Sequence, residues 1–214
     1  MRKRRTIRWK SLLALSVGMA AVALFVFFGS RQERREVVGT VIAGYRYRFT
    51  LSTVWQRDTG RLRMLDVETG LPTPVDDQVF TPRPSPVLEW TYRHLLHRPP
   101  PNSSEIRLTT YTIRDLPAFN FMHRFQEGYP EPILTGQERI LTHRHTEVDG
   151  CPTTIVSLEQ TELKRTHRGT QVLIDVSHHT IVYDLHGFSI SPTDEVSQEI
   201  QAILSSFHVE KIAG

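Results

Sequence analysis

The sequence predicts an α+β fold, in which an antiparallel sheet is flanked by helices on both faces (an α/β/α sandwich) and is preceded by one N-terminal transmembrane helix. Three observations lead to this prediction. Residues 11–30 form an uncharged and mostly apolar run. The C-terminal half contains consecutive strand-like segments with short connections, which favour antiparallel pairing. The chain then closes with an amphipathic helical pattern.

The apolar run is preceded by a basic segment, residues 1–10. Its most apolar part, residues 12–28, contains 17 residues, which is about 26 Å of helix at about 1.5 Å per residue. This length is near the minimum for a helix that crosses a hydrocarbon core of about 30 Å. We therefore predict a signal-anchor helix over residues 11–30. It would meet the lipid bilayer through Leu12, Leu13, Leu15, Val22, Leu24, Phe25, Phe27 and Phe28.

The distribution of charge around this run predicts its orientation. The basic residues that set the topology are Arg2, Lys3, Arg4, Arg5, Arg8 and Lys10. The other side carries three arginines mixed with two glutamates over residues 31–36, a charged stretch that we interpret as a juxtamembrane stalk. The positive-inside rule then leaves the N-terminus in the cytoplasm and residues 37–214 outside it as one extracytoplasmic domain.

A cleaved signal peptide is the alternative to an anchor. Ala21 and Ala23 have the small side chains that a signal peptidase needs, but they lie inside the apolar stretch. Bulky residues follow them up to Phe28. We favour the single-pass anchor, and secretion after cleavage stays the alternative.

The charge of the chain belongs largely to its N-terminus. Of 26 basic and 23 acidic residues, nine basic and two acidic ones lie in residues 1–36, so the remainder has a formal net charge of −4. A folded nucleic-acid-binding domain should carry a basic patch, and we predict no nucleic-acid partner. The single cysteine, Cys151, excludes an intramolecular disulfide.

The N-terminal half of the domain alternates strands with proline-rich connections. We predict strands over residues 37–42, 45–52 and 61–67. The second of these alternates aromatic or aliphatic with polar side chains, which is the pattern of a half-buried strand. Five prolines over residues 71–86 predict a loop, in which Asp76 and Asp77 are a solvated turn. A helix over residues 87–97 follows, with Val87, Leu88, Thr91, Leu95 and Leu96 on one face.

The C-terminal half is predicted to be mostly sheet. After a strand at 106–113, a helix starting near Asp115 and a loop over 128–136, strands follow at 138–146, 153–163, 171–177 and 179–185. Asp149-Gly150 is a tight-turn signal between two of them. A final helix is predicted after Ser191, with an apolar stripe comprising Val196, Ile200, Ile203, Leu204 and Phe207.

Three of these segments resemble the PsbP-like family, whose founding member is an extrinsic subunit of photosystem II. They are residues 47–51 with Trp55, the Asp149-Gly150 turn leading into a long strand, and the closing run 183–207. The resemblance spans roughly residues 45–208. It implies an α/β/α sandwich around an antiparallel sheet and a non-catalytic accessory role beside a membrane complex. It carries over no catalytic residue.

Histidines give the strongest chemical signal outside that resemblance. His143 and His145 are two residues apart and project from the same face of a predicted strand. His178 and His179 are adjacent in a later segment. If those strands are neighbours, two or three imidazoles converge on a metal such as Zn²⁺ or Cu²⁺. Solvent-facing polar positions are the plainer interpretation.

The functional prediction is a membrane-anchored extracytoplasmic accessory or binding module of unknown ligand, which is non-catalytic and acts beside a membrane protein complex. No cofactor is predicted, and the expected partners are the bilayer and a membrane protein. The alternative is a metal-dependent or thiol enzyme that uses the His143, His145, His178 and His179 region together with Cys151.

Overall fold

The structure of the chain is a computed structural model. It describes residues 33–58, 76–84, 87, 90–91, 94–96, 104–114, 119–120, 123–134, 138–162, 165–189 and 195–212. The predicted anchor at 11–30, the strand at 61–67 and the Ser191 helix start lie outside these residues. Among the described residues, no helix combines the length and the apolar character that crossing a membrane requires.

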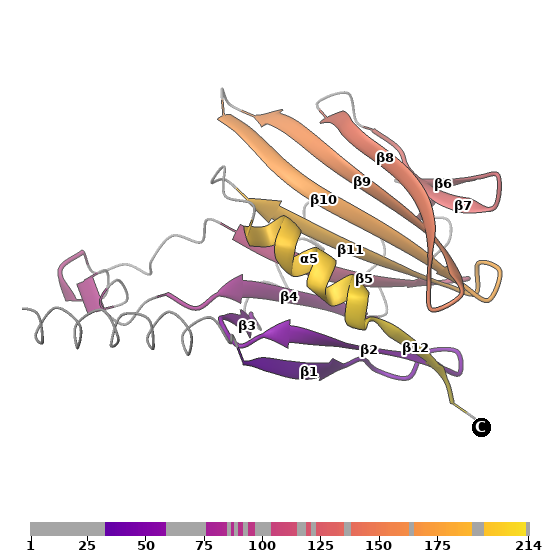
Figure 1. Cartoon of the computed structure of the whole chain (residues 1–214), viewed down its shortest axis with the longest axis horizontal. Helices are drawn as coiled ribbons and strands as arrows, with labels where there is room; N and C mark the ends of the chain where they lie inside the picture. Colours follow the sequence, from indigo (N-terminus) through magenta and orange to yellow (C-terminus); the bar gives the residue numbers. More distant parts are fainter. Residues whose placement is uncertain are drawn as a thin grey trace, which may run out of the picture. The chain divides into compact units, whose positions relative to one another are not determined.

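The described fold is dominated by antiparallel strands (Figure 1). The strands are Arg34–Val38 (β1), Tyr45–Ser52 (β2), Trp55–Arg57 (β3), Asp76–Pro82 (β4), Ser104–Thr112 (β5), His123–Gln126 (β6), Tyr129–Pro132 (β7), Glu138–Val148 (β8), Cys151–Glu162 (β9), Arg165–Val176 (β10), Ile181–Ser189 (β11) and His208–Lys211 (β12). One long helix, Glu195–Ser206 (α5), precedes β12.

The strands form one large sheet and two small ones. The large sheet has seven strands in the order β3-β4-β5-β11-β10-β9-β8, and each of its neighbouring pairs is antiparallel. The small sheets are β1-β2-β12 and the β6-β7 hairpin. Asp149 and Gly150 join β8 to β9 with φ angles of 52° and 73°, so the predicted tight turn is confirmed. Positive φ at both positions matches the right-handed twist of the strands it connects.

The main core lies on one face of the large sheet, which we call the first face. Val196, Ile200 and Ile203 of α5 are buried against side chains of β2, β5, β10 and β11. The stripe predicted on this helix is therefore confirmed. At Gly187 of β11, an added Cβ would lie 2.2 Å from Ile200 Cδ1, so only glycine lets the helix pack this closely.

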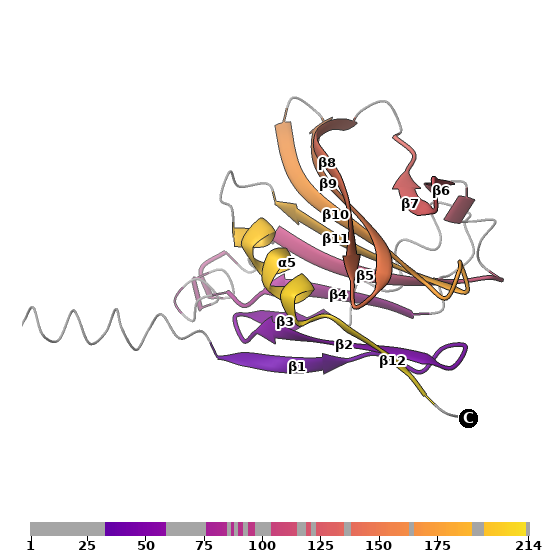
Figure 2. The ribbon, with the colours of Figure 1, turned by 45° about the vertical axis from the view of Figure 1, so that its right-hand side comes forward.

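The opposite face, which we call the second face, is covered differently from the predicted sandwich. Strands β8 to β11 separate α5 from the β6-β7 hairpin in Figure 2. A small apolar cluster on this face contains Phe119, Leu173 and Val182, with Phe125 of β6 packed against it. The prediction of helices on both faces holds only in part for the described residues: besides the helical Phe119 and Asn120, this face is covered by a hairpin and not by a second long helix.

Three local predictions also differ from the structure. Residues 76–82, predicted as loop, form β4 and pair with β5, while residues 129–132 form β7. The prolines misled both predictions. Pro82 is the last residue of β4, beyond the residues that pair with β5, and Pro130 and Pro132 lie in a two-stranded hairpin, where few backbone donors are needed. The first strand starts at Arg34 and not at Val37.

The segment predicted as a helix over 87–97 is helical at each of Val87, Trp90, Thr91 and His94. Its apolar residues do not pack as the pattern predicted. Val87 is 76% exposed and Leu95 is 62% exposed. The helical spacing of apolar residues in this segment therefore predicted the backbone conformation correctly, but it did not predict which side chains are buried.

Candidate functional site

Strand register places two rows of side chains side by side across the second face. One row runs from Asp77 through Thr109, Asp184, Leu173 and Thr154 to His145. The neighbouring row runs from Val79 through Arg107, His186, Gln171 and Val156 to His143. Nine of these twelve residues are polar, so a band of polar and charged side chains crosses this face.

Asp184 is the centre of a buried polar network in these rows. His123 of β6 places Nε2 3.0 Å from Asp184 Oδ2, and Gln171 Nε2 donates to both carboxylate oxygens at 3.0 and 3.1 Å. Burial by itself would raise the pKa of Asp184. The hydrogen bond and charge of His123, with support from His186 and Gln171, outweigh it and lower that pKa. The carboxylate is therefore held ionised and fixes the hairpin to the sheet.

A second part of the network lies toward β4. Arg107 Nε donates to Asp77 Oδ1 at 2.8 Å, and its Nη2 also contacts Asp77. The prediction of a solvated turn at Asp76 and Asp77 is thus wrong, because β4 pairs with β5 and directs Asp77 onto Arg107. Next to this pair, burial lowers the pKa of His186 despite the opposing charge of Asp184.

The open edge of the second face carries a cluster of three potential metal ligands. His143 Nε2 lies 2.8 Å from Glu131 Oε2, and His145 Nε2 contacts Glu131 Oε1. Glu131 is buried in β7, whereas both histidines of β8 are more exposed. The predicted convergence of His143 and His145 is therefore present in the geometry, with a carboxylate as the third group.

His178 and His179 are not part of this cluster. They lie in the β10-β11 turn with φ angles of 51° and 69°. His179 Nδ1 is 2.9 Å from Asp175 Oδ2, and its ring contacts Phe125. The sequence did not reveal Glu131, because residues 128–136 have the prolines and glycines of a predicted loop. The two-residue connection Glu127-Gly128, in which both residues have positive φ, is the turn signal that a hairpin prediction needed.

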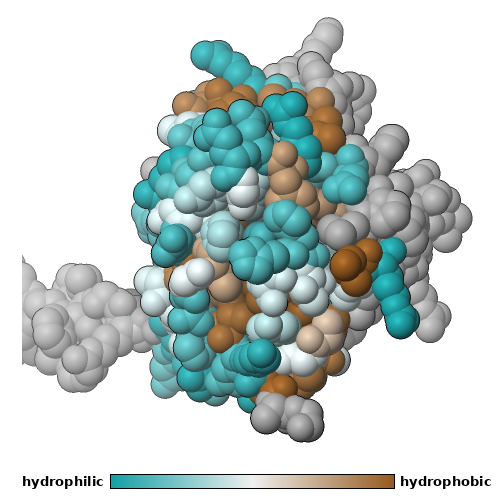
Figure 3. Space-filling view, turned by 90° about the vertical axis from the view of Figure 1, so that its right-hand side faces the viewer, coloured by the Kyte–Doolittle hydropathy of each residue, from teal (hydrophilic) through white to brown (hydrophobic). Residues whose placement is uncertain are grey.

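A groove opens beside the cluster, with a volume of about 600 Å³. Its apolar wall consists of Ile133, Leu134 and Ile140, and its polar residues include Arg124, Glu131 and His143. Figure 3 shows the side of the molecule that faces right in Figure 1, where hydrophobic patches interrupt a hydrophilic surface. The second face thus combines buried polar pairs with an accessible groove at its β8 edge.

Cys151 lies on the other side of the sheet from the histidine cluster. It is partly buried against the first-face core, whereas His143 and His145 pair in register with second-face residues of β9. Burial, with further contributions from Asp149, Asp175 and Glu147, raises the pKa of its thiol to about 11. A thiol with a raised pKa is not the activated thiolate that thiol catalysis needs.

Arg46 and Arg48, which alternate with the aromatic side chains of β2, are engaged with an acidic partner. Arg46 Nη2 lies 2.6 Å from Glu210 Oε2, and Arg48 Nε lies 3.1 Å from Glu210 Oε1. The hydrogen bond from Arg46 lowers the pKa of Glu210. These contacts join β2 to β12 across the small sheet.

No family model matches the chain, and no curated protein matches it. Comparison with solved structures gives fold-level neighbours at low identity. The Ran-binding protein Mog1p of Saccharomyces cerevisiae has 11% identity and a TM-score of 0.44, over 83% of this chain and 95% of that one. Cyanobacterial PsbP of Synechocystis sp. PCC 6803 has 12% identity and a TM-score of 0.44, over 85% and 95%.

Two further structures show the same level of similarity. LpqN of Mycobacterium tuberculosis has 10% identity and a TM-score of 0.44, over 83% of this chain and 91% of that one. A Bacteroides thetaiotaomicron protein has 7% identity and a TM-score of 0.42 over 84% of this chain, which spans only 49% of that protein. The neighbours thus include a PsbP, as the sequence resemblance expected. At these values they assign no family, activity or partner to this chain.

Proposed function

We propose that this chain is a membrane-anchored, extracytoplasmic and non-catalytic module that binds an extended segment of a membrane protein along β8. The observation that carries this proposal is the position of β8. It is the last strand of the large sheet, and among the described residues its sheet partner is β9 alone. It is also long, at 11 residues, and largely exposed.

An edge strand of this kind offers a row of backbone N–H and C=O groups to a further strand. Added strands bind mainly through these groups, and neighbouring pockets select the side chains. Here Ile140 and Leu141 are exposed on β8 itself, and Ile133 and Leu134 border the groove beside it. The partner segment is therefore extended and carries apolar side chains at alternate positions.

The apolar run at residues 11–30 supports the membrane part of the proposal. A helix there would hold the domain at the bilayer surface and would limit the search for a membrane partner to two dimensions. The six basic residues before the run favour an N-terminus in the cytoplasm and the domain outside it.

Site-specific crosslinking of the full-length chain in its membrane tests this function. A photoreactive phenylalanine analogue at Leu141 should crosslink to one defined membrane protein, identified by mass spectrometry. The same analogue at Val54, which is equally exposed but lies between β2 and β3, is the matched control. Ile140→Lys should abolish the Leu141 crosslink. A crosslink that is equally strong at Val54, or the absence of any at Leu141, would refute the proposal.

A further inference from the structure

The β8 edge brings together two imidazoles and a carboxylate that come from two different strands. His143 and His145 are two residues apart on β8, so both side chains lie on the second face. Glu131 of β7 lies over them, and the three groups offer ligand atoms that all lie within 4.8 Å of one another. We infer that Glu131, His143 and His145 form a Zn²⁺ site with one coordination position left open.

The donor set matches the chemistry of zinc. Imidazole nitrogen and carboxylate oxygen both bind Zn²⁺, and two histidines with one glutamate form a known three-ligand set. Zinc–ligand bonds of about 2.0–2.2 Å in a tetrahedral site separate the ligand atoms by roughly 3.4 Å. His143 Nε2 and Glu131 Oε2 are 2.8 Å apart. A small outward rotation of the two exposed imidazoles therefore makes room for the ion.

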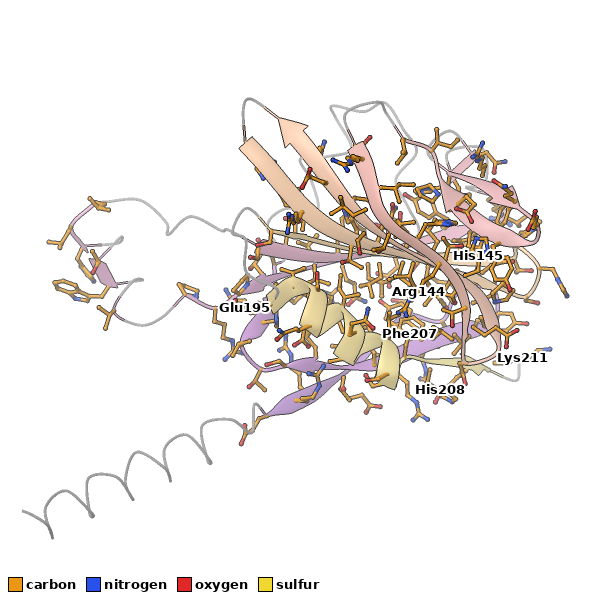
Figure 4. All side chains as sticks on the ribbon, turned by 45° about the horizontal axis from the view of Figure 1, so that its top comes forward. Arg144, His145, Glu195, Phe207, His208 and Lys211 are labelled. Atoms are coloured by element: carbon orange, nitrogen blue, oxygen red, sulfur yellow. The ribbon has the colours of Figure 1, made fainter. Side chains whose placement is uncertain are left out.

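Neighbouring side chains hold these groups in place. The Tyr129 ring stacks on the His145 ring with centroids 4.2 Å apart and an angle of 2° between the planes. Thr154 Oγ1 lies 3.5 Å from Glu131 Oε1 and donates to it. Such contacts orient metal ligands and reduce the entropy lost on binding. Figure 4 labels His145 near the β6-β7 hairpin, with its neighbour Arg144 closer to α5.

Without a cation, the two imidazoles pair directly with the Glu131 carboxylate. Glu131 is 7% exposed, and its two carboxylate oxygens are each contacted by an imidazole Nε2. Each imidazole must keep its proton on Nε2 to donate. Zn²⁺ replaces both of these protons, and the neutral imidazoles then carry their proton on Nδ1. The groove lined by Glu131 and His143 gives water access to the fourth position.

Zinc binding is measured on the tag-free full-length protein in detergent, by calorimetry and by metal analysis after dialysis. The wild type should bind one equivalent of Zn²⁺. His143→Gln and His145→Gln should each raise the dissociation constant by at least about 100-fold, more than losing an outer contact does. His208→Gln is the matched control, because His208 is an exposed histidine paired with one carboxylate, Asp149. It should bind zinc like the wild type.

Cobalt gives a spectroscopic readout of the coordination geometry. Co²⁺ bound to the wild type should show the intense visible absorption of a four-coordinate ion, and Zn²⁺ should displace it. Glu131→Gln should bind Co²⁺ without that spectrum or fail to bind it. A wild type that binds neither ion, or histidine variants that bind as well as the wild type, would overturn the site. Crosslinking at Leu141 is measured separately, so the two proposals fail independently.

Discussion

The two faces of the large sheet differ in what holds them together. The first face is sealed by apolar side chains, among them Phe49, Leu185 and Ile200, against α5 and β2. The second face holds the ion pairs and hydrogen bonds of Asp77, Asp184 and Glu131, and the last two of these involve the β6-β7 hairpin. Apolar packing is non-directional, whereas the polar pairs each need one partner in one place. The first face therefore contributes mainly apolar burial, and the second contributes polar pairs that depend on exact placement.

Removing an aromatic ring from the first face should have the largest effect. Phe49 is 1% exposed and its ring contacts those of Tyr47, Phe80 and Phe207. We expect Phe49→Ala to lower the free energy of unfolding by about 3–5 kcal/mol in a urea titration, since it leaves a cavity. Val54→Ala is the exposed control and should change it by less than about 0.5 kcal/mol. A small effect of Phe49→Ala would mean that the first face is not the main source of stability.

Breaking the buried network of the second face should lower the free energy of unfolding somewhat less than Phe49→Ala does. Asp184→Ala leaves His123 and Gln171 without their acceptor, and we expect a loss of about 3 kcal/mol in the free energy of unfolding. Asp184→Asn keeps the shape and one acceptor oxygen, so it should lose less. Urea titrations measure the free energy of unfolding of both variants and of the wild type. Equal stability of wild type and Asp184→Ala would contradict the network.

The thiol on the first face should be slow to react. The pKa of Cys151 is raised to about 11, so at pH 8 its thiolate fraction is about 100-fold lower than that of a thiol with a pKa near 9. Iodoacetamide labelling followed by mass spectrometry should show a matching loss of rate. The urea-unfolded protein is the control and should react at the ordinary rate. Fast labelling of the folded protein would restore the thiol-enzyme alternative.

The second face should make stability depend on pH. Because burial lowers the pKa of His186 in the folded state, the unfolded chain binds a proton below about pH 6.5 that the folded chain does not. Stability should therefore fall as the pH drops from 7 to 5, by at most about 1.4 kcal/mol per pH unit for this group. The lowered pKa of Asp184 acts in the same direction at lower pH. Thermal unfolding of His186→Gln, compared with the wild type, should show a flatter profile over pH 5–7.

The smallest effect is expected at the exposed pairs of the small sheet. Glu210 contacts Arg46 and Arg48, and exposed ion pairs add little to stability. Glu210→Gln should leave the thermal midpoint unchanged within error, in low and in high salt. A marked, salt-sensitive fall would show that these contacts matter as much as the second-face network does.

The sequence by itself determined the features that depend on neighbours along the chain. Asp149-Gly150 encodes the β8-β9 turn, and the stripe from Val196 to Phe207 encodes the buried side of α5. A period of two places His143 and His145 on one face whatever the rest of the chain does. These predictions were correct because near neighbours alone decide them.

The tertiary structure decided which distant groups meet. Strand order brings Arg107 to Asp77, 30 residues away, and the β6-β7 hairpin brings Glu131 to the two histidines. The sequence concealed both, because prolines made β4 and β7 look like loops. It also suggested His178 and His179 as ligands, but the β10-β11 turn holds them elsewhere. A pairing between strands depends on the free energy of the whole sheet, and no local pattern contains it.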